Sequence, residues 1–373
     1  MAVSLVSTGV QFPDNSIQTT RATQVPAFTN RIINGNMVID QRNAGAEVNP
    51  AVTGYYLDRW NYFQNQTSKG KIGQNAGAVT PPVGFTNYLG FTSTSAYALL
   101  TADQFFIRQD IEGLNTADLA WGTASAATVT LSFWVRSSLT GSFGGAIQNS
   151  GRDRNYPFAF TINSANTWEY KTVTISGDTT GTWLTTNGRG ITVTFSLGTG
   201  ATYSATAGAW TGTSFITSAT GATSVVGTNG ATFYITGVQL EKGSTATSFD
   251  YRPYGTELAL CQRYYYRNAP AAAAKYLVTT AWANQTTTAF AIVQFPVIMR
   301  TAPSALEQTG TAGDYAVFLA NSATTCSSVP AFSAASEYNS LINLTVASGL
   351  TVGQAGTVRS TGTAGYLGFS AEL

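Results

Sequence analysis

The strongest constraint on the fold is an alternation of apolar and polar residues that recurs along the chain and is interrupted by turn signals. In the stretch 127–135, every second position is apolar (Val129, Leu131, Phe133 and Val135), with Thr130, Ser132 and Trp134 between them. A period of two places one face of a β-strand against a core and the other face outside it. Asn187–Gly188 and Asn229–Gly230 are tight-turn signals of the kind that join such strands. The chain is therefore predicted to be all-β.

Similar short runs predict strands on both sides of a change of pattern near residue 255. Before it, strands are expected at Ile32–Ile39, Phe85–Phe91, Phe105–Ile111, Val129–Val135, Trp168–Ile175, Gly190–Leu197 and Thr232–Leu240. After it, strands are expected at Tyr276–Ala283, Thr286–Phe295, Ala316–Leu319, Leu341–Val346 and Tyr366–Leu373. Strands of this length and spacing predict β-sandwiches or jelly rolls.

Four segments follow from these patterns. Residues 1–29 are expected to form a small hairpin that has no core of its own, with a disordered tail as the alternative. Residues 30–254 are expected to form one large jelly-roll domain, and residues 268–373 a small C-terminal β-sandwich head. Between them, Leu258, Cys261 and Tyr265 fall at helical spacing. This spacing predicts a short linker helix over residues 255–267.

Composition excludes several classes of protein. Only 10% of the 373 residues are charged and the net charge is +1, so the chain has no electrostatic footprint for nucleic acid. Its apolar fraction of 43% is too high for a disordered chain. No apolar run reaches the ~20 residues of a membrane span, and the N-terminus lacks the pattern of a secretory signal. The two cysteines, Cys261 and Cys326, are expected to be reduced and unpaired.

The absence of histidine from the sequence excludes further chemistry. Without histidine there is no Ser–His dyad, no His-based zinc site and no imidazole proton shuttle. Asp110 and Glu112 share one face of a predicted strand, which allows an acid/base pair or a Ca²⁺ site. The favoured interpretation is that they are surface residues that pair with Arg108 or Arg136. We therefore expect no catalytic residue, no metal ligand and no cofactor, with a structural Ca²⁺ left open.

Several longer runs resemble a known family. One series is Gly237–Gly243 (GVQLEKG), Phe249–Pro253 (FDYRP) and Glu257–Tyr265 (ELALCQRYY), and two others are Asn30–Met37 (NRIINGNM) and Leu131–Ser137 (LSFWVRS). Together these runs resemble tail fibres and receptor-binding proteins of tailed bacteriophages, especially phages of cyanobacteria and other aquatic hosts. The resemblance covers about residues 30–267. Within it, Trp168–Ile175 (WEYKTVTI) resembles a strand of jelly rolls of the carbohydrate-binding-module type.

The resemblance implies a homotrimeric, non-enzymatic virion fibre that is assembled in the cytoplasm of the host bacterium. It would attach to a tail or baseplate protein through residues 1–29 and bind a glycan on the host cell surface. Two alternatives remain open. One is a structural baseplate or collar component without receptor binding. The other is a tailspike that cleaves glycans, which needs two carboxylates flanking the scissile bond.

Aromatic residues are the natural candidates for a glycan site, because Tyr and Trp offer flat apolar faces with a polar group at the edge. In the head, the predicted glycan-binding residues are Tyr276, Trp282, Tyr315 and Tyr338, which lie near predicted loops. In the large domain, the candidates are Trp60, Trp121, Trp134 and Trp183, most of which are interpreted as core. The sequence leaves open which of the two domains carries the glycan site.

Overall fold

The computed structural model describes residues 29–269 and 275–373, together with the backbone of three short strands near the N-terminus. These strands are β1 (Ser4–Val6), β2 (Gly9–Gln11) and β3 (Ile17–Gln18). They form an antiparallel sheet with β2 in the middle, so the first segment has one strand more than the expected hairpin. The loop expected at 270–274 lies outside the described residues.

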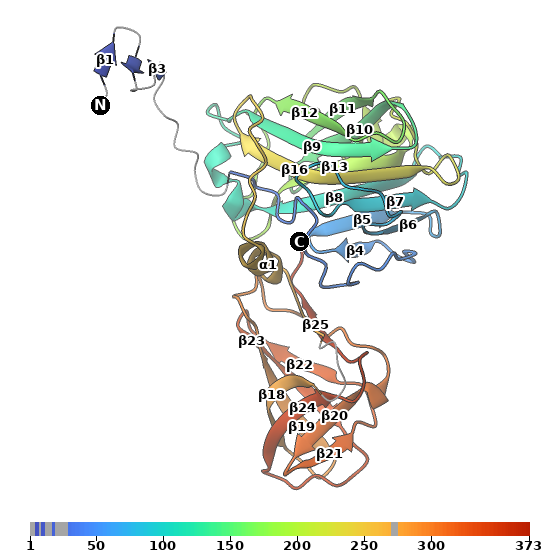
Figure 1. The fold of residues 1–373 in the computed structure, drawn as a ribbon, viewed down its shortest axis with the longest axis vertical. Coiled ribbons are helices and arrows are strands. Elements are labelled where there is room, and N and C mark those ends of the chain that lie inside the picture. Colours follow the sequence, from blue (N-terminus) through green and yellow to red (C-terminus); the bar gives the residue numbers. More distant parts are fainter. Residues whose placement is uncertain (1–3, 7–8, 12–16, 19–28, 270–274) are drawn as a thin grey trace.

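Two antiparallel sheets stacked face to face make up the large domain, which we call the body (Figure 1). The six-stranded sheet has the order β11 (Asn155–Ile162), β10 (Gly141–Gln148), β13 (Arg189–Thr199), β8 (Gln104–Glu112), β5 (Trp60–Gln64) and β4 (Gly54–Leu57). The five-stranded sheet has the order β12 (Glu169–Ile175), β9 (Val129–Ser137), β16 (Thr232–Lys242), β7 (Leu89–Ser93) and β6 (Gly70–Gln74). This is the predicted β-sandwich of the jelly-roll class.

Shorter elements fill the loops of the body. They are the 3₁₀-helices η1 (Gly113–Asn115), η2 (Ala117–Leu119) and η3 (Ala201–Tyr203), and the two-stranded parallel sheet of β14 (Ser204–Ala205) and β15 (Ser218–Ala219). The pair β14–β15 contacts β10, β11 and β13, so it lies against the six-stranded sheet.

Large aromatic and branched side chains fill the space between the two sheets. The alternation at 129–135 is confirmed, because its apolar residues are buried while Trp134 lies on the outer face. In the core, the Phe133 ring meets Phe160 and Phe195 edge-on, with centroid distances of 5.0 Å in both pairs. Each such aromatic pair contributes about 0.5–1.5 kcal/mol beyond the burial of its area. The sandwich therefore has two outer faces, one on each sheet.

The strand expected at Ile32–Ile39 is wrong, because the backbone of this segment is irregular. Asn34 and Met37 have left-handed φ angles of 57° and 59°, which interrupt an extended strand. The Asn34 side chain replaces the missing ladder: it donates to the carbonyl of Ile39 (2.8 Å) and accepts from its N–H (3.0 Å). Ile32 and Met37 nevertheless belong to the body core. The apolar pattern thus indicated burial without indicating an extended backbone.

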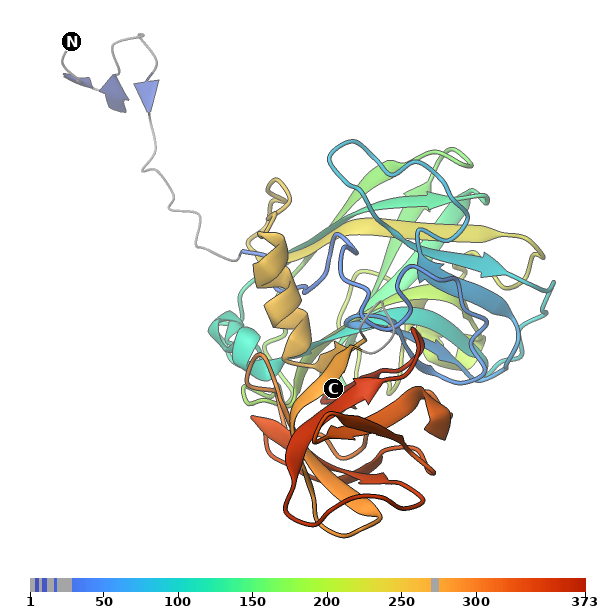
Figure 2. The ribbon, with the colours of Figure 1, turned by 60° about the horizontal axis from the view of Figure 1, so that its bottom comes forward.

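A helix and a β-ladder lead from the body to the second sandwich. Helix α1 (Tyr254–Gln262) is present where a linker helix was expected over 255–267, but it is shorter. The chain re-enters extended structure at β17 (Tyr265–Asn268), which pairs with β25 (Leu367–Ser370). Figure 2 shows the helix beside the body and the C-terminus at the place where the two sandwiches meet.

Residues 275–373 form the second sandwich, which we call the head. Its seven-stranded sheet has the order β21 (Ser322–Thr325), β20 (Tyr315–Leu319), β24 (Ala355–Ser360), β18 (Tyr276–Ala283), β19 (Thr288–Gln294), β23 (Asn339–Thr345) and β22 (Ala331–Ala335). The 3₁₀-helix η4 (Ala312–Asp314) precedes β20. The sheet curls around its core, because Cys326 beyond β21 bridges Val346 beyond β23. The pair β17–β25 packs on the same core through Leu367 and Phe369.

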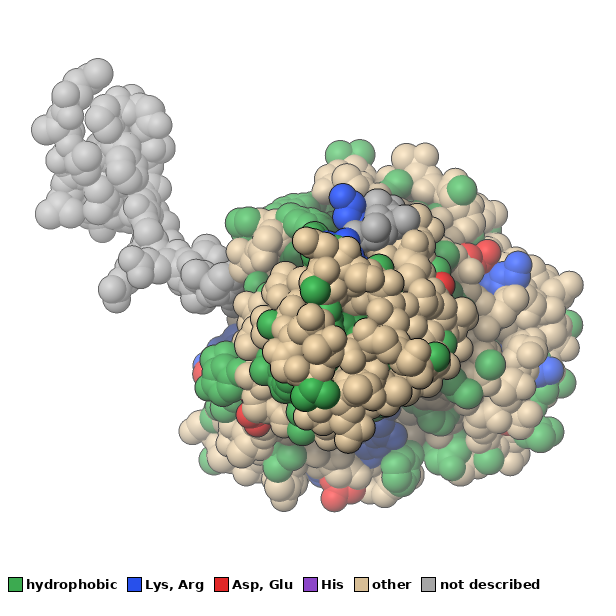
Figure 3. Space-filling model, turned by 90° about the horizontal axis from the view of Figure 1, so that it is seen from below, with side chains coloured by type: hydrophobic (Ala, Val, Ile, Leu, Met, Phe, Trp, Pro, Cys, Tyr) green, Lys and Arg blue, Asp and Glu red, His purple; other side chains and the backbone are tan. Residues whose placement is uncertain are grey.

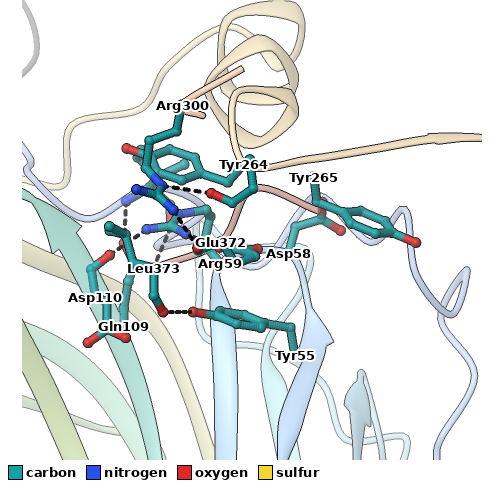
Figure 4. A network of polar contacts seen from close by, with 12 residues as sticks. Tyr55, Asp58, Arg59, Gln109, Asp110, Tyr264, Tyr265, Arg300, Glu372 and Leu373 are labelled. Atoms are coloured by element: carbon teal, nitrogen blue, oxygen red, sulfur yellow. Dashed lines mark hydrogen bonds and ion pairs between the residues drawn. The ribbon is translucent and has the colours of Figure 1, made fainter. Parts of the chain in front are cut away.

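Buried charged groups fix the junction between body and head (Figure 4). Arg59 is 1% exposed; it pairs with Glu372, and its guanidinium carbon lies 3.5 Å from the centre of the Tyr264 ring. Arg300 donates to the carbonyl of Glu372 at 2.7 Å. Glu112 on β8 accepts from the Tyr264 hydroxyl at 2.6 Å. Because an unpaired buried charge is costly, these contacts hold the two sandwiches in one arrangement.

Two smaller expectations concern the cysteines and membrane insertion. Cys261 and Cys326 are free and buried, as predicted, and burial raises the pKa of Cys326 to about 12. Over the part of the chain that the structure describes, no helix has the length and hydropathy needed to cross a bilayer.

Candidate functional site

The outer face of the five-stranded sheet carries a groove of about 660 Å³, which we call the aromatic groove. This volume lies within the range of ~300–1,000 Å³ that is usual for small-molecule sites. Its lining comes from strands β9, β12 and β16 and from the loops that precede β7 and follow β16. The lining residues are Val83, Phe85, Ser132, Trp134, Tyr170, Gly237, Ala246, Thr247, Ser248, Phe249 and Tyr251.

One wall of the groove is a pair of rings on neighbouring strands. Trp134 on β9 and Tyr170 on β12 are directly opposite each other in the antiparallel register. Their ring centroids lie 5.5 Å apart, with 50° between the ring planes. Both residues occupy outward positions of the period-two pattern, and Tyr170 is 43% exposed. The strand pairing therefore presents two aromatic rings side by side at the surface.

The other wall is a cluster of three rings from two loops. Phe85 lies 5.2 Å from Phe249 and 5.5 Å from Tyr251, measured between ring centroids. Phe249 and Tyr251 are 4.8 Å apart in an edge-on arrangement. The Tyr251 hydroxyl donates to the carbonyl of Gly84 at 2.9 Å, which ties one loop to the other. Tyr251 remains 54% exposed, so its ring is available to a ligand.

Two buried polar residues at the outer face of β16 hold the loop that carries Phe249. Glu241 accepts hydrogen bonds from the Thr247 N–H at 2.8 Å and from the Thr247 hydroxyl at 2.7 Å. Gln239 accepts from the Asp250 N–H at 2.8 Å. Glu241 and Gln239 are 2% and 0% exposed, so these bonds are shielded from water. The loop is thus fixed on both sides of Phe249.

Gly237 allows the two walls to approach each other. It lies at an irregularity in the pairing of β16 with β9, and its φ angle is +59°. A Cβ atom at this position would lie 2.6 Å from Cζ of Phe85 and 3.2 Å from Cδ1 of Trp134. Glycine inside a strand often marks a bulge or a close approach of this kind. Any larger residue at position 237 would fill the floor of the groove.

The groove is built for binding flat, partly apolar ligands that also carry hydroxyl groups. Its rings offer apolar faces, and the side chains of Ser132, Thr247 and Ser248 lie among them. None of the described residues that line it is acidic or basic. Such a site favours stacking against the C–H faces of a ring, supplemented by a few hydrogen bonds, over charge pairing.

The four residues predicted as the glycan site in the head do not form one cluster. Tyr315 is fully buried and donates to the carbonyl of Tyr366 at 2.8 Å, so this candidate is wrong as a surface ring. Tyr276 and Tyr338 are 52% and 58% exposed. Tyr276 and Trp282 lie at opposite ends of β18, roughly 20 Å apart along the strand. The role of Tyr276, Trp282 and Tyr338 in binding stays a prediction.

Among the tryptophans of the body, only one of the four candidates lines the aromatic groove. Trp60 and Trp121 are 1% and 7% exposed and belong to the core, as interpreted from the sequence. Trp183 packs edge-on against Trp121 at 4.6 Å. Trp134 is the groove residue. Sequence reasoning did not single out Tyr170, although its outward place in the alternation of β12 was a usable signal.

The carboxylates of Asp110 and Glu112 are engaged by arginines. Asp110 lies 3.5 Å from Arg108, the partner expected from the sequence. Glu112 pairs instead with Arg263, which lies far along the chain, at 2.6 Å. The interpretation is therefore confirmed for Asp110 and Arg108, but it is wrong for Glu112, which pairs with neither Arg108 nor Arg136, and both carboxylates are buried and not on the surface. Across the described residues, no group of three or more Asp, Glu, Cys or His side chains is placed to hold a metal ion.

The surface around these sites is poor in charge. Seen from the side of the head, uncharged polar and apolar side chains cover most of the molecule, and charged groups are scattered (Figure 3). This agrees with the charged fraction of 10%. On such a surface, a cluster of charged side chains is unusual and marks a place to look for a function.

No protein-family model matches this chain, and no curated protein matches it by sequence. Among solved structures, it is similar to the enzymatically active domain of tailspike protein 4 of bacteriophage CBA120 (10% identity, TM-score 0.33), over 59% of this chain and 22% of that chain. It is also similar to a putative sugar binding protein from Bacteroides thetaiotaomicron (13% identity, TM-score 0.33), over 57% and 100% of the two chains. A third is the family 11 carbohydrate-binding module from Clostridium thermocellum (11% identity, TM-score 0.28), over 53% and 100%. At such low scores, these similarities carry no information about what this chain binds.

Proposed function

We propose that this protein is a non-enzymatic adhesive fibre subunit that binds a cell-surface glycan through the aromatic groove of its body. The observation that carries the proposal is the pair of aromatic walls that face each other across Gly237. A sugar ring lying on this aromatic surface would rest one C–H face against Trp134 and Phe85. Ser132 and Thr247 would remain within the same lining for its hydroxyl groups.

Binding is proposed in place of cleavage. Glycoside hydrolysis uses two carboxyl groups ~5–9.5 Å apart on either side of the scissile bond. The described residues that line the groove include no carboxylate, and the nearby Glu241 is held by Thr247 and Gln239. Incubating the protein with a glycan that it binds should therefore release no new reducing ends.

We further propose that the protein is a homotrimeric phage tail fibre, which attaches to a tail or baseplate protein through residues 1–29. The runs at 30–37, 131–137 and 237–265 support it by their resemblance to such fibres. Mass measurement in solution should give three chains per particle, and a stable monomer would contradict the trimer.

The decisive experiment compares two tryptophans, one from each sandwich. A glycan array first selects an oligosaccharide, and calorimetry then measures its affinity for the full chain and two variants. Trp134→Ala removes part of one groove wall and should weaken binding by about tenfold or more, as expected for an aromatic anchor. Trp282→Ala removes a half-buried ring from the head and should leave the affinity unchanged.

The opposite result would move the site to the head. If Trp282→Ala abolishes binding while Trp134→Ala keeps it, the proposal for the groove is wrong and the prediction made from sequence is favoured. Both tryptophans are half-buried on the outer face of a sheet, so loss of folding should affect the two variants similarly. Circular dichroism of both variants checks that they remain folded.

A further inference from the structure

A second unusual cluster lies on the other side of the body, on the outer face of the six-stranded sheet. Asp110 on β8 is 1% exposed, and arginines approach both of its carboxylate oxygens. Arg189 Nε lies 3.1 Å from Oδ1, and Arg108 Nε lies 3.5 Å from Oδ2. The Thr192 hydroxyl also donates to Oδ1. Asp110 is therefore ion-paired with two guanidinium groups.

A third arginine reaches the same place from a turn. In the six-stranded sheet, Gln148 at the end of β10 is opposite Thr192, and Thr192 is opposite Asp110. Arg152 lies in the turn that follows Gln148, and its guanidinium lies by the Phe215 ring. Burial and the two neighbouring guanidinium groups lower the pKa of Arg152 to about 10. The three arginines thus repel one another around a single carboxylate.

The neighbouring carboxylates do not relieve this imbalance. Glu112, the cross-strand neighbour of Arg189, is held by Arg263 and by the Tyr264 hydroxyl. Asp153, next to Arg152 in sequence, accepts from the Asn149 side chain at 2.7 Å. Arg59, which bonds to the Asp110 carbonyl, is itself paired with Glu372, so among the described residues Asp110 is the one carboxylate that pairs with Arg108 and Arg189. The side chains of Arg108 and Arg189 are only 11% and 21% exposed, so charge interactions are weakly screened there.

The two ion pairs with Asp110 do not use the terminal amino groups of the arginines, which remain able to donate hydrogen bonds. Arg108 and Arg189 meet Asp110 through Nε, the inner nitrogen of the guanidinium. No described residue accepts a hydrogen bond from their terminal amino groups or from those of Arg152. Planar guanidinium groups match the paired oxygens of carboxylate, sulfate and phosphate groups.

An exposed aromatic ring lies beside this cluster. Phe215 is 46% exposed, and the guanidinium carbon of Arg152 lies 5.9 Å from its ring centre. Its φ angle of +62° is rare for a bulky residue. The Phe215 N–H donates to the carbonyl of Arg152 at 2.8 Å, which fixes the ring next to the arginine. An apolar face next to an anion-binding group is the combination that an acidic sugar requires.

We propose that Arg108, Arg152 and Arg189 bind the oxyanion of an acidic sugar, such as the carboxylate of a uronate or a sulfate ester, with Phe215 against the sugar ring. This acidic-sugar site lies on the sheet opposite the aromatic groove. It does not rest on the function proposed for that groove. A chain with both sites would contact an acidic polysaccharide on two faces.

The test uses the full chain and trigalacturonate as the probe, with neutral galactotriose as the matched ligand. Calorimetry at low salt should detect binding of trigalacturonate that Arg152→Gln weakens by about tenfold, the effect of losing one charged hydrogen-bonding group. Arg136→Gln changes an arginine on the other sheet and should leave the affinity unchanged. Neutral galactotriose should bind Arg152→Gln and the unchanged protein equally, which separates this proposal from that for the groove.

The melting temperature of Arg152→Gln distinguishes a role of Arg152 in binding from a merely structural role. Because Arg152 is repelled by its neighbours, Arg152→Gln should melt at the same temperature as the unchanged protein or higher. A lower melting temperature with unchanged trigalacturonate affinity would overturn the proposal. So would the failure of both trigalacturonate and a sulfated trisaccharide to bind. Inorganic sulfate or phosphate that binds as tightly as the acidic sugars would overturn the assignment to a sugar.

Discussion

The two outer faces of the body follow the same alternating pattern but have opposite chemistry. On the five-stranded sheet, outward positions such as Trp134 and Tyr170 are aromatic and partly open to solvent. On the six-stranded sheet, the outward positions Arg108, Asp110 and Glu112 are charged and nearly buried. The first face carries a groove without charge, and the second carries ion pairs and the junction with the head. Alternation thus selects which residues lie outside the core without determining whether they meet solvent.

This difference teaches where each kind of interaction is strong. Ion pairs gain strength where loops and the head exclude water, as they do around Glu112 and Arg59. At the open groove, charge pairing would be screened, and apolar contact with flat rings is the stronger contribution. We therefore expect substitutions of the buried ion pairs near the junction to affect stability and substitutions in the aromatic groove to affect glycan binding.

The largest expected effect is that of a substitution at the junction between the body and the head. Glu112→Ala removes a carboxylate that is 1% exposed and accepts from Arg263 at 2.6 Å and from the Tyr264 hydroxyl at 2.6 Å. Loss of one partner from a buried pair should lower the free energy of unfolding by about 3 kcal/mol, measured by urea titration. Glu47→Ala removes an exposed carboxylate and is the matched control, with an expected change within about 0.5 kcal/mol.

Lowering the pH should weaken the same Glu112–Arg263 pair that Glu112→Ala removes. Burial alone would raise the pKa of Glu112, but hydrogen bonds from Arg263 and Tyr264 outweigh it and hold the pKa below its ordinary value. A lowered pKa in the folded state contributes stability above the ordinary value, and that stability is lost as pH falls through the lowered pKa. The Glu112→Ala variant should lack this loss. Equal acid sensitivity in both proteins would contradict the assignment.

Much of the fold followed from the sequence, because a period of two is a local property of the chain. The strands expected near β8, β9, β12, β13 and β16 are present in the body, and those of the head have counterparts in β18, β19, β20, β23 and β25. The failure at 32–39 has a physical reason. Asn34 satisfies the backbone of Ile39 with its side chain, and an apolar pattern alone does not show such a substitute for a ladder.

The candidate site was harder to predict because it depends on residues that only the fold brings together. The groove joins Phe85, Trp134, Tyr170 and Phe249, which are spread over more than 160 positions of the chain. No local pattern relates them. The sequence left open which domain carries the site, and the glycan-binding residues predicted from it were Tyr276, Trp282, Tyr315 and Tyr338 in the head. The buried Tyr315 shows that a tyrosine next to a predicted loop can equally belong to a core.

The smallest expected effect concerns a single oxygen in the groove. Tyr170→Phe keeps the ring that lies 5.5 Å from Trp134 and removes only the hydroxyl. If stacking carries the binding, the affinity for the selected oligosaccharide should change by less than about twofold, whereas Tyr170→Ala should weaken binding by about fivefold. Calorimetry on the three proteins measures both steps. A tenfold loss in Tyr170→Phe would show that the hydroxyl contacts the glycan, and the five-stranded face would then bind by polar contacts, much as we propose for its charged counterpart.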